Sequence, residues 1–284
     1  MGSFDYSKTP FPLLVLVFLS LLHITYGTRN LFSLYQPPPM SLTYHNGDLL
    51  ESEIKISILW YGKFSPAQKS IIVDFLRSLN SPSKIWSRNT PTVTKWWQTI
   101  QTYLTKAGKK ETQLAHSKKG ELTLVLTAQD VVVEGFCMGN CGYHGSGQGK
   151  RSVFIWVGNS ATQCPGQCAW PFHQPIYGPQ AKPLGAPNGD VGADGMVVNI
   201  ASFLAGVVTN PYGNGYYQGP PEAPLEAASA CPGLYGKGAY LGYAGELLVD
   251  PITGASYNAH GTNGRKYLLP GLFDPNKSAC STIV

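Results

Sequence analysis

Six cysteines are the residues whose type and spacing point most directly to chemistry. They are Cys137, Cys141, Cys164, Cys168, Cys231 and Cys280. In a secreted chain an even number of cysteines is typical of disulfides. The two C-x3-C pairs predict local bridges, 137 to 141 and 164 to 168, with the last two cysteines joined to each other. Spacing alone leaves open the alternative in which the two pairs cross.

Zinc is the competing interpretation of the same residues. His144 follows Cys141 by three residues and His173 follows Cys168 by five. Structural zinc sites combine closely spaced cysteines and histidines, but they are found mostly where thiols stay reduced. We therefore expect disulfides, with no bound metal and no other cofactor.

Two carboxylates come close enough in sequence for acid and base catalysis. Asp190 and Asp194 would suit a glycosidase, which needs a pair of carboxyl groups on either side of the scissile bond. The run Asn188-Gly-Asp190 is also typical of a turn in which the aspartate bonds its own backbone, and we favour the turn. The chain has no H-E-x-x-H and no G-x-S-x-G motif. A non-catalytic protein is expected. The alternative is a hydrolase, either a glycosidase using these two aspartates or a metal-dependent hydrolase using some of His144, His173 and the same aspartates.

Aromatic residues set among glycines and prolines are the candidates for ligand binding. They are Trp170, Tyr177, Tyr212, Tyr216 and Tyr217. They do not lie on apolar stripes, so we expect exposed rings that offer amphipathic contact at low entropy cost, with the alternative that half of them belong to the core. Together with His173, Asp190 and Asp194 they form the predicted ligand-binding set.

The elements that must position these residues can be recognised from hydrophobic periodicity. Strands are predicted at 54–61, 122–127, 131–133 and 152–157, and helices at 66–79, 91–104 and 196–208. An S-x-x-Q capping box at Ser65 begins the first helix, and Pro211 ends the last. We expect Trp96 and Trp97 in the core and a solvated connection from Lys106 to Gly120.

This order predicts an α/β or α+β fold: one domain with a mixed sheet, packed helices and a disulfide-linked C-terminal half rich in glycine and proline. From Cys137 onward lie 25 of the 32 glycines, which favours loops over regular elements there. The net charge of +5 is spread along the chain without a basic arm, so nucleic acid is not an expected partner.

The first residues predict a targeting segment. Lys8 precedes an apolar run over 11–22, which is too short for a membrane span, and Gly27 offers a small residue for cleavage. We predict a secretory signal peptide at 1–27, a single extracellular domain at 28–284 and no membrane span after cleavage. Asn276-Lys277-Ser278 is a candidate glycosylation site.

Several longer motifs resemble one known family. They are Ile58-Leu-Trp-Tyr-Gly62, Gly135-Phe-Cys137, Trp156-Val-Gly-Asn159, Gln163-Cys-Pro-Gly-Gln-Cys-Ala-Trp-Pro-Phe172, Pro187-Asn-Gly-Asp-Val191, Thr209-Asn-Pro211 and Gly264-Arg-Lys-Tyr-Leu-Leu-Pro270. Over residues 31–284 the chain is similar to the plant EXORDIUM or phosphate-induced protein 1 family. The resemblance implies a secreted protein of the cell wall space, or apoplast, linked to brassinosteroid-dependent growth and cell expansion.

The resemblance also frames what the protein would bind. It implies a binding or signalling component whose partner is a cell-wall polysaccharide or an extracellular receptor or partner protein, with a cell-wall hydrolase as the alternative. Members of the family usually carry a longer segment between the helix with the tryptophan pair and the strand at 122–127. In this chain only the lysine-rich connection after Lys106 stands there.

A second resemblance concerns the helix before Pro211. It is similar to the active-site helix of bacterial secreted metallopeptidase-like proteins that read S-H-E-L-x-E-x-x-T-D-P. Aligned on Thr209, Ser202 falls at the histidine, Phe203 at the glutamate and Gly206 at the second acidic residue. The resemblance implies a degenerate zincin-like fold whose zinc chemistry has been lost.

Overall fold

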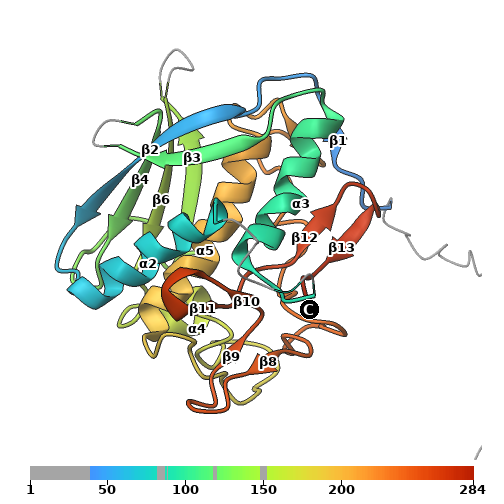
Figure 1. Ribbon diagram of the computed structural model, residues 1–284. Coiled ribbons are helices and arrows are strands. Elements are labelled where there is room, and N and C mark those ends of the chain that lie inside the picture. Colours follow the sequence, from blue (N-terminus) through green and yellow to red (C-terminus); the bar gives the residue numbers. More distant parts are fainter. Residues whose placement is uncertain (1–38, 82–86, 88, 118–119, 148–151) are drawn as a thin grey trace, which may run out of the picture. The chain divides into compact units, whose positions relative to one another are not determined.

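The centre of the fold is a five-stranded mixed sheet with the strand order β3-β2-β4-β6-β5 (Figure 1). Its strands are β2 Ser52–Tyr61, β3 Thr112–His116, β4 Leu122–Thr127, β5 Gly142–Ser146 and β6 Val153–Gly158. All run parallel except β5, which pairs antiparallel with β6 at one edge. The computed structural model describes residues 39–81, 87, 89–117, 120–147 and 152–284. The predicted signal peptide at 1–27 lies outside these residues, and residues 40–284 form one compact unit.

The described residues form four helices, and the start of the first agrees with its sequence signal, whereas the second begins at 93 instead of 91 and the longest begins at 191 instead of 196, where Asp190 caps it. The four helices are α2 Pro66–Leu79, α3 Val93–Lys106, the single turn α4 Pro165–Cys168 and α5 Val191–Thr209. The predicted capping box is present, because the Ser65 hydroxyl accepts from Gln68 N and the Gln68 side chain accepts from Ser65 N. Thr92 caps α3 by accepting from Lys95 N at 3.2 Å.

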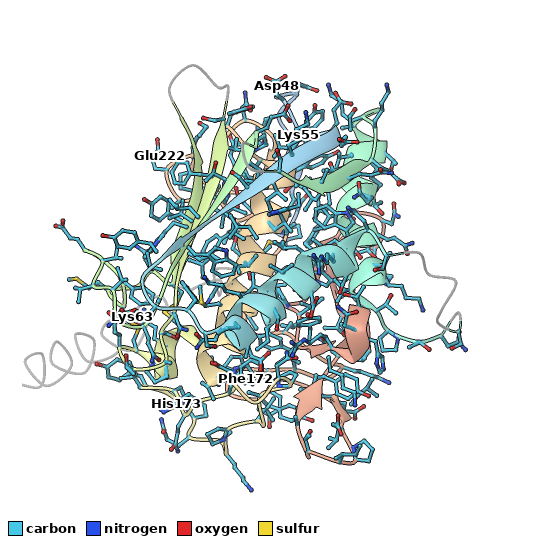
Figure 2. All side chains as sticks on the ribbon, turned by 60° about the vertical axis from the view of Figure 1, so that its left-hand side comes forward. Asp48, Lys55, Lys63, Phe172, His173 and Glu222 are labelled. Atoms are coloured by element: carbon cyan, nitrogen blue, oxygen red, sulfur yellow. A yellow bond between two sulfur atoms is a disulfide. The ribbon has the colours of Figure 1, made fainter. Side chains whose placement is uncertain are left out.

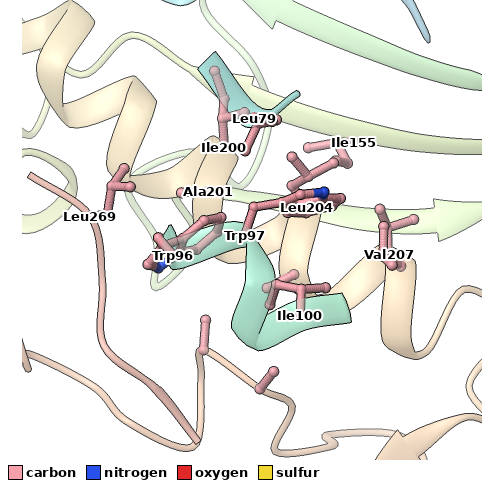
Figure 3. Close-up of a cluster of buried hydrophobic side chains, with 14 of the residues drawn as sticks. Leu79, Trp96, Trp97, Ile100, Ile155, Ile200, Ala201, Leu204, Val207 and Leu269 are labelled. Atoms are coloured by element: carbon pink, nitrogen blue, oxygen red, sulfur yellow. The ribbon is translucent and has the colours of Figure 1, made fainter. Parts of the chain in front are cut away.

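The core lies where α2, α3 and α5 meet beside the sheet (Figure 3). Trp96 and Trp97 are both buried, as predicted, and the Trp96 indole donates to the Pro270 carbonyl at 2.8 Å. α5 is long and apolar enough to cross a membrane, but 78% of the span tested is buried within the protein. Its contacts with β5, β6, α2 and α3 make it the central core helix.

The connection after α3 corrects one prediction. It is not simply solvated, because β3 forms within it and pairs with the first half of β2. His116 of β3 and Leu122 of β4 both pair with Ile56, on opposite sides of β2. The chain therefore leaves β3 on one side of β2 and enters β4 on the other, and only five residues of sequence, 117–121, separate the two strands. Connections between parallel strands usually take about a dozen residues or more.

Gly120 allows this short crossing. A Cβ at Gly120 would overlap the Lys55 carbonyl oxygen and lie 2.7 Å from Ser57 N, both of which are backbone atoms of β2. Ser117 N donates to the Ile56 carbonyl at 2.8 Å on the other side of the crossing. Only a residue without a side chain can pass this close to the β2 backbone.

One strand prediction is wrong, and one further strand of the sheet is not predicted. Residues 131–133 form no strand, and Val132 is 89% exposed, since this segment lies in the loop that follows β4. β5 was not predicted, because its sequence Gly-Tyr-His-Gly-Ser lacks apolar alternation. Pairing with β6 alone makes it a strand.

The C-terminal half contains short strands joined by turns. They are β7 Tyr216–Tyr217, β8 Leu248–Val249, β9 Ser256–Tyr257, β10 Ala259–His260, β11 Lys266–Tyr267, β12 Leu272–Asp274 and β13 Ala279–Ser281, with a 3-10 turn at Thr262–Gly264. β7 pairs with β1 Thr43–Tyr44, and the others form three hairpins, β8-β9, β10-β11 and β12-β13.

The disulfides cross between the two C-x3-C pairs. Cys137 is bonded to Cys164 and Cys141 to Cys168, so the predicted local bridges are wrong, whereas the predicted bridge from Cys231 to Cys280 is confirmed. α4 explains the difference. Its turn places the sulfurs of Cys164 and Cys168 side by side, 3.7 Å apart, where each bonds across to the loop at 137–141.

Candidate functional site

A groove beside α4 brings together two of the predicted aromatic residues. It has a volume of about 360 Å³ and is walled by residues 166–179 and 232–242. The side chains and backbone that line it belong to Gly166, Gln167, Trp170, Pro175, Tyr177, Gly178, Pro179, Pro232, Gly233, Tyr240, Leu241 and Gly242. None of these described lining residues is charged. The groove is therefore an uncharged, aromatic and proline-lined surface.

Disulfides anchor both walls of this groove. The first wall begins within α4, which two disulfides tie to the loop at 137–141. The second wall begins at Pro232, directly after Cys231, which is bonded to Cys280. At the far end, Tyr240 and Tyr243 exchange two backbone hydrogen bonds of 3.0 and 2.8 Å in a tight turn.

The rings of the groove are open to solvent to different degrees. Tyr177 is 87% exposed and Tyr240 is 68% exposed, while Trp170 is half-buried, with its ring centroid 5.7 Å from that of Tyr235. Trp170 therefore packs against a buried ring. Burial also raises the pKa of Tyr235 well above its ordinary value. In the part of the chain that the structure describes, the Trp170 indole N–H and the Tyr177 and Tyr240 hydroxyl groups have no hydrogen-bond partner.

The other predicted ligand-binding residues do not join this groove. His173 is exposed on the adjacent loop beside the buried Phe172, with Nδ1 3.0 Å from the Gln174 carbonyl oxygen (Figure 2). Tyr216 is a core residue, not an exposed ring, because it stacks on Tyr44 with centroids 4.8 Å apart.

Tyr217 and Tyr212 belong to the same region as Tyr216. Tyr217 stacks on His45 with ring centroids 3.9 Å apart, and Tyr212 is half-buried against the core. Exposure is therefore wrong for Tyr216, for which the core alternative holds, and Tyr212 and Tyr217 are half-buried. Tyr240 was missed, because tyrosines are frequent in the glycine-rich half and no local pattern marks this one.

Asp190 and Asp194 hold the start of α5 in place. Asp190 is the N-cap and accepts from Ala193 N at 2.9 Å, while its other oxygen accepts from the Gln68 amide at 2.9 Å. Both oxygens of Asp194 accept from Asn188, at 2.8 Å from the backbone N–H and 2.6 Å from the side chain. Burial raises the pKa of Asp194 to about 7, against the lowering effect of these hydrogen bonds. The turn interpretation of this segment is confirmed, and the two carboxylates are engaged in its structure.

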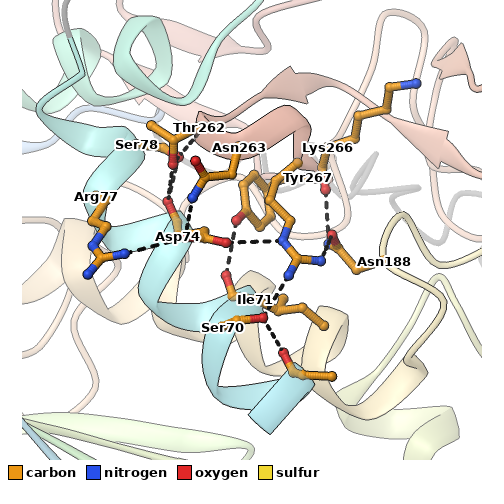
Figure 4. Close-up of polar contacts among 12 residues, drawn as sticks. Ser70, Ile71, Asp74, Arg77, Ser78, Asn188, Thr262, Asn263, Lys266 and Tyr267 are labelled. Carbon is orange, nitrogen blue, oxygen red and sulfur yellow. Dashed lines mark hydrogen bonds and ion pairs between the residues drawn. The ribbon is translucent and has the colours of Figure 1, made fainter.

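A polar cluster that the sequence did not reveal lies beside this turn (Figure 4). Buried Asp74 of α2 accepts from Arg265 Nε at 3.2 Å and from the Asn263 amide at 2.9 Å. Arg265 also donates to Asn188 at 3.2 Å and to the Ser70 hydroxyl at 2.7 Å. The adjoining cavity of about 560 Å³ is lined partly by these groups. The polar groups of the cluster form hydrogen bonds with one another. These bonds join α2, the turn before α5 and the β10-β11 hairpin.

His144 of β5 forms a second, partly buried polar cluster beside the C-terminal half of α5. Its Nε2 lies 2.8 Å from Glu226 Oε2, and the other Glu226 oxygen accepts from the Asn210 amide at 2.7 Å. Gly206 packs against this pair, since a Cβ there would lie 2.7 Å from His144 Nε2. His144 Nδ1 is buried without a partner among the described residues.

The zinc interpretation finds no support in this geometry. All six cysteines are in disulfides, and His144 and His173 lie in separate places. Among the described residues, no three His, Cys, Asp or Glu side chains gather in a way that could hold a metal ion.

Comparison with known proteins relates the chain to one family. A family model described as the phosphate-induced protein 1 conserved region matches residues 42–119 and 111–283. The chain is 51% identical to Protein PHOSPHATE-INDUCED 1 of Nicotiana tabacum over 310 positions, covering 96% of this chain and 98% of that relative. It is 52% identical to Protein EXORDIUM of Arabidopsis thaliana over 305 positions, covering 94% and 97%. No solved structure matches.

The alignments also bear on the short crossing at β2. The alignment with the tobacco protein is 26 positions longer than the 284-residue chain, so at least 26 residues of that relative have no counterpart here. The two stretches matched by the family model meet at residues 111–119, between the start of β3 and the crossing. This agrees with the shortened segment that the sequence analysis identified.

Proposed function

Because the chain belongs to the phosphate-induced protein 1 family, which includes the EXORDIUM proteins, we propose that it is secreted into the plant cell wall space and acts there by binding. In this proposal it is a non-catalytic component of brassinosteroid-dependent growth and cell expansion. Its ligand is a cell-wall polysaccharide or an extracellular receptor or partner protein.

The observation that carries the proposal is the groove beside α4. Exposed Tyr177 and Tyr240 offer large, rigid contact area on a surface that three disulfides hold in place. Aromatic rings that are anchored and exposed are typical of binding surfaces. Disulfides agree with an extracellular location, where they form and persist.

The binding proposal is tested with a double variant, Tyr177→Ala/Tyr240→Ala. The full chain carrying a C-terminal fluorescent tag is expressed in a plant, and its amounts in the wall fraction and in the extracellular fluid are measured together with organ elongation. We expect the double variant to be secreted but to lose wall retention and growth effect. Tyr61→Ala/Tyr143→Ala is the matched control, because these rings are 61% and 51% exposed outside the groove. Equal retention of wild type and groove variant would contradict the proposal.

Secretion is tested separately. We expect the full chain in the extracellular fluid with a mature N-terminus near Thr28, and the same chain lacking residues 2–27 inside the cell. Equal distribution of both forms would remove the apoplastic location from the proposal.

A zincin-like origin is the second part of the proposal and concerns the fold. It is supported by the position of Phe203 and Gly206, which face β5 at Gly142 and His144 respectively. The His144–Glu226 pair fills the space beside Gly206, where the resemblance would put an acidic side chain. An experimental structure superposed on zincins tests it: α5 and the sheet should superpose together, and a match of the sheet alone would refute it.

A further inference from the structure

We propose that the groove beside α4 binds a proline-rich polypeptide in the polyproline II conformation. The inference rests on the proposed function, since it names the ligand class of the same groove. Of the two ligand classes open for this surface, it selects a polypeptide over a polysaccharide.

The lining residues favour this ligand by shape and charge. The lining combines the rings of Trp170, Tyr177 and Tyr240 with prolines and glycines, and no charged side chain belongs to the described lining. Proline-rich segments dock into aromatic-lined grooves because their rings pack on aromatic faces and their conformation is formed in advance. An uncharged groove suits an uncharged polypeptide of this kind.

The hydrogen-bonding groups point the same way. A polyproline II chain has no internal hydrogen bonds, so its carbonyl oxygens are free acceptors, and its prolines carry no N–H. The lining includes Trp170, whose indole N–H can only donate, and Tyr177 and Tyr240, whose hydroxyl groups can donate to such carbonyl oxygens. Sugar hydroxyls donate as well as accept, and the described lining has no carboxylate, which is the strongest side-chain acceptor for them. The donors of the groove therefore complement a polypeptide backbone better than a polysaccharide.

The groove is also prepared for binding before a ligand arrives. Gly242 has φ of +87° and lies against Pro179, so close that a Cβ would lie 2.6 Å from the proline ring. This contact joins the two walls, which disulfides already anchor at α4 and at Cys231. A rigid groove loses little conformational entropy when it binds an already extended chain.

The experiment measures fluorescence anisotropy of a labelled oligoproline peptide with the mature chain, residues 28–284, made in a secretory host. We expect saturable binding, about tenfold weaker in Tyr240→Ala and in Tyr177→Ala, as for residues central to an interface. Trp170→Phe keeps an aromatic ring at this position but removes the indole N–H, so it should also weaken binding. Tyr61→Ala, on β2, is the control that should bind like wild type. Circular dichroism checks that each variant is folded.

Oligosaccharides of cellulose and xyloglucan form the second arm, as unlabelled competitors and as ligands in calorimetry. Oligosaccharide binding that Tyr240→Ala abolishes, without oligoproline binding, would overturn the ligand assignment. Oligoproline binding that all groove variants retain would overturn the site. If wall retention in plants depends on the groove but oligoproline does not bind, this inference fails and the proposed function stands. If neither depends on the groove, both fail.

Discussion

At the scale of single residues, Asp194 links the fold to pH. Its buried carboxyl group has a pKa raised to about 7, above the value of 3.8 for an unfolded chain. The protonated form is therefore favoured in the folded state. The contribution of this group to stability is fully present below about pH 4 and is lost as pH rises through about 7. We predict that its contribution to the free energy of unfolding falls by about 2 kcal/mol between pH 5 and pH 8.

The measurement is urea denaturation of wild type and Asp194→Asn at both pH values. Comparison with the variant is needed because His260, whose pKa burial lowers, acts in the opposite direction and destabilises the fold as pH falls. The difference between the two proteins isolates Asp194. A pH dependence that is the same in both would show that its carboxyl group ionises normally in the folded chain.

Gly206 is the residue on which the His144–Glu226 pair depends. Gly206→Ala adds about 1 kcal/mol of helix propensity within α5. The new methyl group, however, would overlap Glu226 Oε2 and crowd His144 Nε2. Crowding in a packed core costs about 1–3 kcal/mol, and separating a buried pair adds to it. We predict a net loss of about 2 kcal/mol in thermal or urea unfolding.

Ser202→Ala is the control for this prediction, because it lies one turn earlier on α5 and its hydroxyl bonds only the Val198 carbonyl. It should change stability by less than about 0.5 kcal/mol. If Gly206→Ala stabilised the protein instead, the pair would have room to move, and the close packing described for this helix would be wrong.

At the scale of elements, the sequence predicted those with strong periodicity. β2, α2 and α3 carry apolar residues at the spacing that burial on one side demands, and α5 is apolar along most of its length because it is buried nearly all round, so local pattern and tertiary environment agree. β3 and β5 are short edge strands that exist because a neighbour offers backbone partners, and five-residue patterns carry too little information to show this. The valines at 131–133 have strand propensity but no neighbour.

The same reasoning applies to the candidate site. Trp170 and Tyr177 could be predicted, because rings among prolines and glycines have no apolar stripe to join. Tyr216 has the same local sequence character, yet it is buried against Tyr44 and Tyr103. Which ring is covered depends on the pairing of β1 with β7, across more than 170 residues, and this is not visible in local sequence.

The crossing of β2 gives the prediction that belongs to this scale. In Gly120→Ala the new methyl group would meet backbone atoms of Lys55 and Ser57, which cannot rotate away as a side chain can. We expect a loss of about 2–3 kcal/mol, with weakened β3 pairing visible as faster amide exchange at 112–116. Gln113→Ala, on the exposed side of β3, should be nearly neutral. Slow exchange at 112–116 in the glycine variant would show that the chain takes another route around β2.

At the scale of the whole molecule, the disulfides divide into two kinds. Cys137–Cys164 and Cys141–Cys168 lie next to each other and close almost the same stretch of chain. When one is removed, the other still closes that stretch, so the unfolded chain gains freedom only over about ten residues. Cys231–Cys280 has no such neighbour and closes a separation of 49 residues, holding the β12-β13 hairpin to the segment that follows Glu226.

Chain entropy therefore predicts an order of stability for two double variants. Removing the bridge from 231 to 280 should cost about 4 kcal/mol, and removing only that from 137 to 164 about 2.5 kcal/mol. Since a domain is stable by about 5–15 kcal/mol in total, Cys231→Ser/Cys280→Ser should lower the melting temperature more than Cys137→Ser/Cys164→Ser. Calorimetry of the two secreted proteins measures both. The reverse order, or equal losses, would contradict the prediction that the crossed pairs support each other. Peptide mapping of the unreduced wild-type protein should then show Cys137 joined to Cys141.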